Sequence, residues 1–237
     1  MKYIDRSQVG EPAILQGLAA PTKEEEVDDG IYGHDDVKKA LNQLQRGVCC
    51  YCESRYNHTT FGDVEHFRPK KGFKQDEKDV LHKPGYYWLA HKWENLMYAC
   101  EQCNRVYKHN YFPLKDRTKR FDPKVCDISQ EEPLLINPYE EKNPENHLTF
   151  VGTAIKPLTD KGVASITYYG LERKELDEPR QEVYNDIIAF IDAVKIAEGT
   201  SAEAPMIEKL KARINGKIAA GQHTLMVKSN FGKYLEI

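Results

Sequence analysis

Four of the six cysteines in this 237-residue chain form two Cys-x-x-Cys pairs, Cys49/Cys52 and Cys100/Cys103. Four thiolates are the tetrahedral ligand set that Zn²⁺ favours in a closed structural site. The pairs of a zinc ribbon are usually separated by about 15–20 residues, but here residues 53–99 lie between them. The spacing therefore predicts a structural zinc ion at the base of a long insert. A dithiol redox protein is the alternative, although neither pair follows the βαβ pattern of a thioredoxin-type site.

The insert and the second cysteine pair also carry residues suited to phosphodiester hydrolysis. Glu65 and His66 are adjacent, Asn95 lies five residues before the second pair, and Asn104 follows Cys103 directly. Histidine is the natural general base near neutral pH, and carboxylate and carboxamide oxygens suit a hard cation such as Mg²⁺. Consecutive residues of a strand face opposite sides, so one of the Glu65/His66 pair can ligate a metal while the other activates water. A base and one metal together suffice for this hydrolysis, and the zinc site would pre-position Asn104 through Cys103.

The elements that must position these groups are short strands and loops, with helices on either side. Apolar residues recur at helical spacing between Val37 and Leu44, which predicts a helix from Asp35 to a stop at Gly47. The pattern then predicts, in order, short strands and loops over 53–85, a more helical segment over 88–107, loops over 113–147, a β-prone run over 165–169, and helices over about 173–198 and 204–216. We therefore expect an α+β fold, with a metal-stapled unit at its centre.

The net charge of −3 and the sequence pI near 6.3 argue against a small basic nucleic-acid-binding domain, whose pI typically exceeds about 9. The total hides an asymmetry, because residues 65–120 sum to +6 and the remainder of the chain to −9. A basic segment that overlaps a predicted phosphodiesterase site favours a surface that tracks phosphates. The predicted phosphate contacts are Arg68, Lys70, Lys71, Arg105 and Lys108.

Composition and the lack of a membrane span or signal peptide indicate a globular cytoplasmic protein without membrane contact. Hydrophobic residues make up 40% and charged residues 30% of the chain. No stretch approaches the ~18 apolar residues of a membrane helix, and the first residues lack the apolar run of a signal peptide.

Cys50 lies between two predicted zinc ligands and could replace either, while Cys126 is expected to be a buried small side chain.

The order Cys-x-x-Cys, Glu-His, Asn, Cys-x-x-Cys-Asn with the downstream Lys108 resembles the HNH endonucleases, which have a treble-clef, ββα-metal core. The resemblance covers roughly residues 45–120. It implies a zinc-stapled HNH nuclease core there, after an N-terminal segment with a helix over 1–44. The mainly helical region over 121–237 is then the candidate for partner docking, within a largely α-helical chain.

The HNH resemblance also implies a role for each residue of the site. His66 is the general base, and Asn95 braces the loop that holds it. Glu65 stands where the family usually has Asp, and Asn104 takes the last position; both would bind a catalytic Mg²⁺ or Mn²⁺. Asp63 and His109 are the rival ligands.

Five further segments resemble the nuclease subunits of the Septu anti-phage defence system, which also occur with some retrons. These segments are 86–90, 93–96, 111–114, 135–139 and 169–173. This resemblance implies DNA as the substrate and a PtuA-like ATPase subunit, or retron components, as partners in a hetero-oligomeric complex. The sequence lacks Gly-x-x-x-x-Gly-Lys, so any ATP dependence would come from the partner. The alternative is a non-catalytic zinc module that binds nucleic acid or a partner protein.

Overall fold

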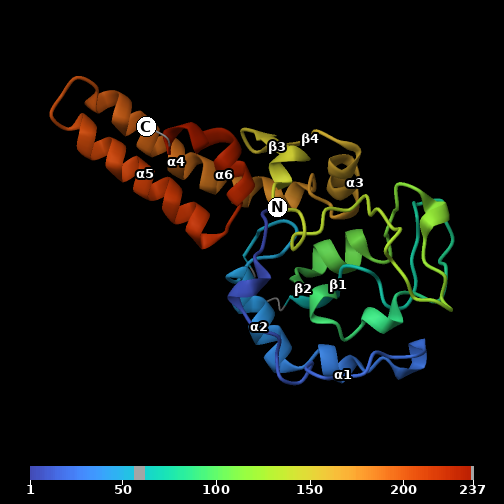
Figure 1. Cartoon of the computed structure of the whole chain (residues 1–237). Coiled ribbons are helices and arrows are strands. Elements are labelled where there is room, and N and C mark those ends of the chain that lie inside the picture. The colour runs from blue at the N-terminus through green and yellow to red at the C-terminus, as the bar shows by residue number, and fades with distance from the viewer. Residues whose placement is uncertain (56–61, 236–237) are drawn as a thin grey trace.

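The computed structural model describes residues 1–55 and 62–235 and combines helices with two small antiparallel sheets (Figure 1). Residues 56–61, inside the predicted nuclease core, lie outside the described residues. The α-helices and strands of the described chain are α1 Asp29–Tyr32, α2 Asp35–Gln45, β1 Asp63–His66, β2 Leu96–Ala99, β3 Leu148–Val151, β4 Ala154–Pro157, α3 Asp160–Tyr168, α4 Asp177–Ala197, α5 Glu203–Ala220 and α6 Thr224–Phe231. A π-helix spans Gln102–Lys108, and short 3₁₀ helices span Arg6–Gln8, Glu24–Glu26, Tyr87–Leu89, Trp93–Asn95, Arg117–Lys119, Pro144–Asn146, Lys174–Leu176 and Gly232–Tyr234. No helix in the described part of the chain has the length and apolar character needed to cross a bilayer.

Helix α2 forms where the sequence predicted it and leads directly into the first cysteine pair. The His34 side chain accepts a hydrogen bond from the Asp36 amide at its start, and Arg46 closes its end in the left-handed conformation. The helix is tied to β2 by Gln45, whose side-chain amide donates to the Tyr98 carbonyl and accepts from the Tyr98 amide. This pairing fixes the loop of the first cysteine pair beside the strand that leads to the second.

Strands β1 and β2 pair antiparallel, with His66 opposite Leu96 and Asp63 opposite Ala99, and the π-helix follows at once. The helical pattern predicted over 88–107 was therefore wrong for Leu96–Ala99. All four of these residues are buried, and an apolar run buried on both faces carries no periodicity that separates strand from helix. The order strand, strand, helix agrees with the predicted ββα arrangement, while membership of the treble-clef class stays a prediction.

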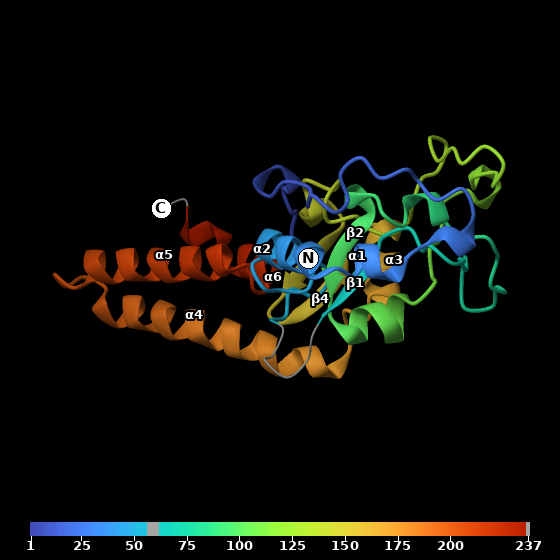
Figure 2. The ribbon, with the colours of Figure 1, turned by 90° about the horizontal axis from the view of Figure 1, so that it is seen from below.

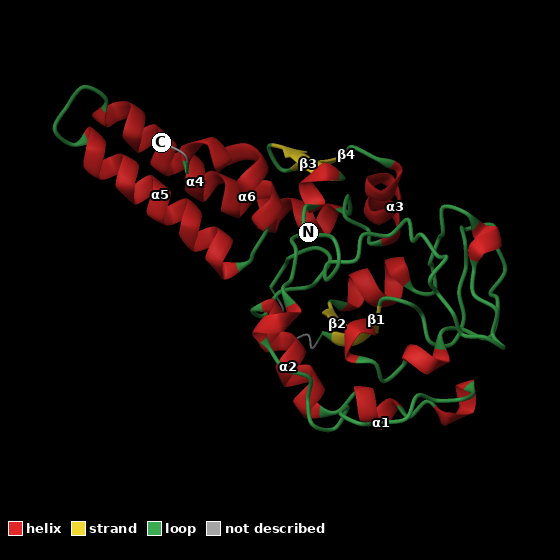
Figure 3. Cartoon of the chain, viewed as in Figure 1, coloured by secondary structure: helices red, strands yellow, loops and turns green. Residues whose placement is uncertain are grey.

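The C-terminal region contains the β3–β4 hairpin besides its helices (Figure 3). The β-prone run predicted over 165–169 was wrong, because residues 165–168 complete α3 and Tyr169 caps its end. The Thr159 side chain caps this helix by accepting from the Gly162 amide, and the helix buries Ala164, Ser165 and Ile166. Nearby tertiary contacts thus decide the conformation of a segment whose intrinsic preference is weak.

Helices α4 and α5 form an antiparallel hairpin that projects from the rest of the molecule (Figures 1 and 2). Both helices were predicted, with α5 extending to Ala220 beyond the expected end near 216. Helix α6 follows near the base of the hairpin, and the Gly232–Tyr234 3₁₀ helix after it lies alongside the hairpin (Figures 1 and 2). The region predicted for partner docking, 121–237, thus includes a projecting helical hairpin, and its role in docking stays a prediction.

Residues from all three predicted parts of the chain contribute to one buried cluster. The Ile4 amide donates to the Pro138 carbonyl at 2.8 Å, and the Tyr51 ring stacks on the Tyr169 ring with centroids 3.8 Å apart. The C-terminal region therefore packs directly on the loop of the first cysteine pair. The division of the chain at residues 44 and 120 stays a prediction.

Candidate metal centre and active site

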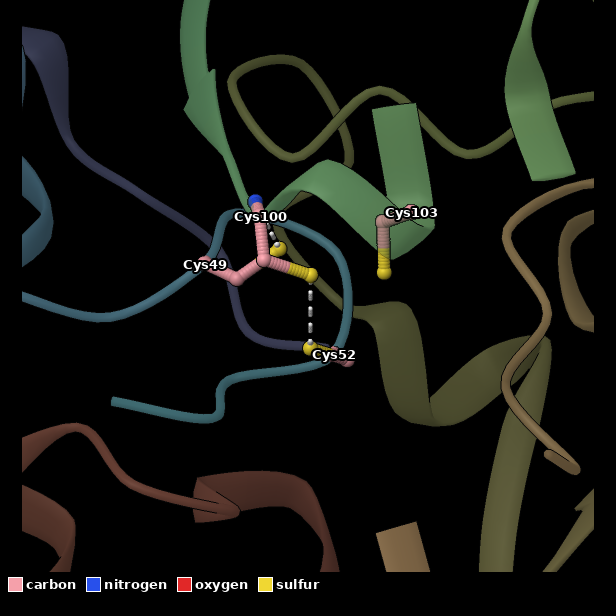
Figure 4. Close-up of side chains that lie close together, drawn as sticks. All are labelled: Cys49, Cys52, Cys100 and Cys103. Carbon is pink, nitrogen blue, oxygen red and sulfur yellow. Dashed lines mark hydrogen bonds between the residues drawn. The ribbon is translucent and has the colours of Figure 1, made fainter. Parts of the chain in front are cut away.

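The four cysteines of the two pairs meet at one point, as Figure 4 shows. Cys49 and Cys52 come from the loop after α2, and Cys100 and Cys103 from the junction of β2 with the π-helix. All four Sγ atoms lie within 4.8 Å of one another, and Cys52 Sγ is 3.9 Å from Cys100 Sγ. Tetrahedral geometry with Zn–S distances near 2.3 Å separates the sulfurs by about 3.8 Å. The cluster can therefore hold a zinc ion.

The burial of the cysteines favours metal binding over free thiolates. Burial raises the pKa of the Cys49 and Cys103 thiols, so these groups favour the neutral thiol unless a metal binds the thiolate. The Cys100 amide donates to Cys49 Sγ at 3.3 Å, which fixes this sulfur toward the second pair. A closed, buried tetrathiolate site is typical of structural zinc rather than of a reactive dithiol.

The two other cysteines lie outside this group of four. Cys50 is fully buried, and burial raises the pKa of its thiol. Cys126 is half-buried rather than buried as expected. Its Sγ donates to the Pro123 carbonyl at 3.2 Å and lies 3.6 Å from the Tyr87 hydroxyl.

His66 ends β1 and is 4% exposed. Its Nε2 donates to the Ala90 carbonyl at 2.9 Å; because a carbonyl can only accept, this contact places the proton on Nε2 and leaves a lone pair on Nδ1. Lys70 Nζ lies 3.5 Å from that Nδ1. Burial, followed by the nearby Lys70 charge, holds the pKa of His66 well below its ordinary value. The imidazole is therefore in its neutral, basic form at neutral pH.

Asn95 is buried behind the segment that follows His66. Its Oδ1 accepts from the Arg68 amide at 2.8 Å, and its Nδ2 donates to the Arg68 carbonyl at 3.1 Å and to the Leu89 carbonyl at 3.2 Å. The Phe67 amide also donates to the Asn95 carbonyl. These contacts are of the bracing kind that the HNH resemblance implies for Asn95, and its catalytic importance stays a prediction.

Glu65 faces the π-helix and is paired with Lys108. Lys108 Nζ lies 2.5 Å from Glu65 Oε1 and donates to the His66 carbonyl at 2.9 Å. The Tyr51 hydroxyl donates to the same Glu65 oxygen at 3.3 Å. The two side chains are 1% and 5% exposed, so Lys108 neutralises a buried carboxylate. Lys108 was predicted to contact a phosphate. In this arrangement its ammonium group is buried against Glu65 and is not accessible to a substrate.

The rival ligand Asp63 makes the direct contact with Asn104. Asn104 Nδ2 lies 3.2 Å from Asp63 Oδ2, and the Arg105 guanidinium binds both oxygens of this carboxylate at 2.6 and 2.7 Å. The oxygens of Asp63 and of the Asn104 carboxamide, whose orientation can reverse, fit the chemistry of a hard cation. Both Asp63 and Glu65 thus remain predicted ligands of the catalytic metal, each paired here with a basic residue.

A surface pocket of about 440 Å³ brings most of the predicted site together. It is lined by Val64, Glu65, His66, Pro69, Lys70, Lys71, Asn104, Arg105, His109 and Asn110. A second pocket of about 640 Å³, lined in part by Tyr32, Lys38 and Asp63, shares Val64, Asn104 and Arg105 with it. Arg68 does not join them, because its guanidinium is buried against Glu131 at 3.3 Å. Arg68, like Lys108, is therefore placed to support the fold rather than to meet phosphate.

Sequence reasoning missed two contacts that shape the site. The Tyr32 ring meets the His66 ring edge to face with centroids 4.6 Å apart, and Lys70 Nζ lies 4.3 Å from the Tyr32 centroid. Tyr32 belongs to α1, outside the predicted nuclease core, and nothing in its spacing signalled this role. The N-terminal segment therefore forms part of the wall around the predicted base.

The chain is 41% identical to Septu protein PtuB of Bacillus mycoides (strain KBAB4) over 183 residues. The match covers 76% of this chain and 61% of the relative, so the chain spans about three fifths of that relative's length. No protein-family model matches the chain, and no solved structure matches it. This similarity supports the resemblance to Septu proteins that the sequence indicated. The chain is PtuB-like in sequence across three quarters of its length.

Proposed function

We propose that this chain is a metal-dependent endonuclease of the HNH type, which hydrolyses DNA phosphodiester bonds as the nuclease subunit of a Septu-type anti-phage complex. The observation that carries the proposal is the setting of His66. Its Nε2 is held by the Ala90 carbonyl, its Nδ1 is directed to Lys70, and the ring lines a pocket with Asn104 and Arg105. This is the arrangement that a positioned general base requires.

In the proposed reaction, His66 Nδ1 accepts a proton from the attacking water. The low pKa of His66 keeps this nitrogen unprotonated at neutral pH. Lys70 and the exposed Lys71 line the pocket and place positive charge where a phosphate would lie. Asn95 holds the Arg68 backbone and so keeps the chain after His66 in place.

Asn104 with Asp63 or Glu65 would hold the catalytic Mg²⁺ or Mn²⁺. A divalent ion bound there supplies charge stabilisation for the scissile phosphate and the leaving oxygen. Arg105, whose side chain is 62% exposed, is free to turn from Asp63 toward a phosphate when a cation takes its place. The four cysteines would hold zinc in a structural role. Zinc binding by Cys103 would in turn fix the backbone beside Asn104, the next residue.

The proposed partners follow from the similarity to a Septu protein and from the charge pattern. The net +6 of residues 65–120 suits a DNA backbone. We assign the contact with a PtuA-like ATPase to the C-terminal region, in which the α4–α5 hairpin projects away from the site. The proposed setting is the cytoplasm, where a Septu ATPase or retron components would complete the complex.

The direct test is cleavage of plasmid DNA by the protein co-purified with its PtuA-like ATPase, in Mg²⁺ or Mn²⁺ and with an EDTA control. His66→Ala should abolish cleavage while zinc content and folding stay at their wild-type levels. His82→Ala is the matched control, since His82 lies on the same insert but pairs with Asp79 outside the pocket. Undiminished cleavage by His66→Ala would refute the role of this base.

The alternative, a zinc module that binds without cleaving, is favoured by the basic residues that occupy both predicted carboxylate ligands. Lys108 binds Glu65 and Arg105 binds Asp63. A nuclease requires at least one of these carboxylates for its metal, so Asp63→Asn or Glu65→Gln should raise the Mg²⁺ concentration needed for half-maximal cleavage. DNA binding by the wild-type complex with no cleavage at any Mg²⁺ or Mn²⁺ concentration would support the binding module instead.

A further inference from the structure

Arg173 lies against the tetracysteine cluster although it is 70 residues from Cys103 in the sequence. Its Nη1 donates to Cys103 Sγ at 3.3 Å, and its Nη2 donates to Cys100 Sγ at 3.7 Å. Nη1 also donates to the Gly170 carbonyl at 2.9 Å. The residue is 9% exposed, so its charge is largely removed from water. The guanidinium therefore bridges the second cysteine pair and the turn after α3.

The turn that carries Arg173 is built for close approach to the π-helix. Gly170 has a φ of +61°, and a Cβ there would lie 2.3 Å from the Tyr107 ring. Only a residue without a side chain allows both this backbone conformation and this contact. The Arg173 guanidinium then lies 5.9 Å from the Tyr107 centroid. The position of Arg173 over the sulfurs is thus enforced by the packing of the turn.

The electrostatics of a four-thiolate site supply a reason for this guanidinium. Four thiolates around Zn²⁺ leave a net charge of about −2 in a buried setting, which is costly unless nearby donors and cations offset it. A planar guanidinium can donate to two sulfurs at once, whereas an ammonium group acts as a single point charge. Groups that donate to metal ligands orient them and tune the affinity of the site.

We propose that Arg173 is a positioning residue of the zinc centre, which stabilises the Cys100 and Cys103 thiolates and locks the C-terminal region to the metal-bearing core. The contact links two parts of the chain that are far apart in sequence. Loss of Arg173 weakens zinc retention directly, whether or not the chain cleaves DNA. The inference is therefore independent of the proposed nuclease activity.

Arg180 offers a matched control in the same neighbourhood. It is 3% exposed, and its Nη2 donates to the Leu171 carbonyl at 2.8 Å. Its guanidinium thus binds the backbone of the turn after α3 and makes no hydrogen bond to a cysteine sulfur. Comparison of Arg173→Lys with Arg180→Lys separates contact with the thiolates from the general effect of replacing a buried arginine.

The experiment uses full-length zinc-loaded protein and follows zinc transfer to a coloured chelator, with the folded fraction monitored by circular dichroism. Arg173→Met should bind zinc about 10- to 100-fold more weakly than wild type, and Arg173→Lys should release zinc faster than Arg180→Lys. The Cys100 and Cys103 thiols of Arg173→Lys should also be alkylated faster than those of Arg180→Lys.

Two results would overturn the proposal. One is zinc release from Arg173→Lys at the rate of Arg180→Lys, with equal alkylation of both variants. The other is wild-type protein that carries no zinc. If Arg173→Met fails to fold, the two lysine variants still decide the question, because both retain the positive charge.

Discussion

Lys108→Met should strongly destabilise the fold, because it leaves the Glu65 carboxylate buried without its counter-ion. The two side chains are 1% and 5% exposed, and Nζ lies 2.5 Å from Oε1. The same ammonium group donates to the His66 carbonyl at 2.9 Å. The substitution therefore removes a buried charge pair and a backbone contact of the predicted base together.

The expected magnitude follows from the geometry of the pair. At 2.5 Å the attraction is about 7 kcal/mol with an effective dielectric constant near 20, but the desolvation of both groups offsets most of it. Removal of one partner costs about 3–5 kcal/mol because the other charge stays buried. Lys108→Met combined with Glu65→Gln leaves no charge, so we expect a coupling energy of about 2–3 kcal/mol between the two substitutions.

Urea unfolding of the zinc-loaded proteins, followed by tryptophan fluorescence, measures this cycle. The four proteins are wild type, Lys108→Met, Glu65→Gln and the double variant, with the exposed Lys92→Met as a control expected to change stability by less than ~0.5 kcal/mol. The reasoning fails if Lys108→Met costs less than about 1 kcal/mol. It also fails if the double variant loses the full sum of the two single effects.

Three further predictions concern the zinc centre, a turn and a buried histidine. Removal of zinc by a strong chelator should unfold residues around the cysteine cluster, which a loss of tertiary circular dichroism would record; an unchanged spectrum would contradict a structural role. Gly170→Ala should lower the free energy of unfolding by more than ~2 kcal/mol, because its Cβ meets the Tyr107 ring, whereas Gly199→Ala, with a similar φ and open space, should cost only about 1 kcal/mol of backbone strain. Burial lowers the pKa of His223 to about 4. Between this value and pH 6.5, the His223 imidazole is therefore protonated in the unfolded chain and neutral in the folded chain. Wild type should therefore lose about 2 kcal/mol more stability than His223→Asn between pH 7 and pH 5, and equal losses in urea unfolding would contradict this.

The parts of the structure that the sequence predicted well depend on local rules. Helix α2 follows from its apolar spacing and its capping residues, and α4 and α5 follow from long helical patterns. The pairing of two short strands around Glu65 and His66 could be anticipated less well. β2 was hidden in an apolar run buried on both faces, and the segment over 165–169 became helical through its cap and its neighbours.

Some parts of the candidate site could likewise be predicted from local sequence. The cluster of four cysteines could be predicted from spacing, because tetrahedral thiolate coordination imposes its own stereochemistry on two Cys-x-x-Cys pairs. The pocket around His66 also contains Asn104, Lys70, Lys71 and Arg105, which the sequence had singled out. Their types and order carried that information, since general-base and cation chemistry restrict the residues that can serve.

By itself, the sequence determined the donor groups of this protein: four thiolates, one histidine, and the carboxylates and carboxamides near them. Tertiary structure alone decided their charge partners. Lys108 neutralises Glu65, Arg105 holds Asp63, and Arg173 reaches the sulfurs of the cysteine cluster from a distant turn. These pairings join residues separated by 42 to 73 positions. No local pattern encodes them, because burial of a charge and the search for its counter-ion are settled only when the whole chain packs.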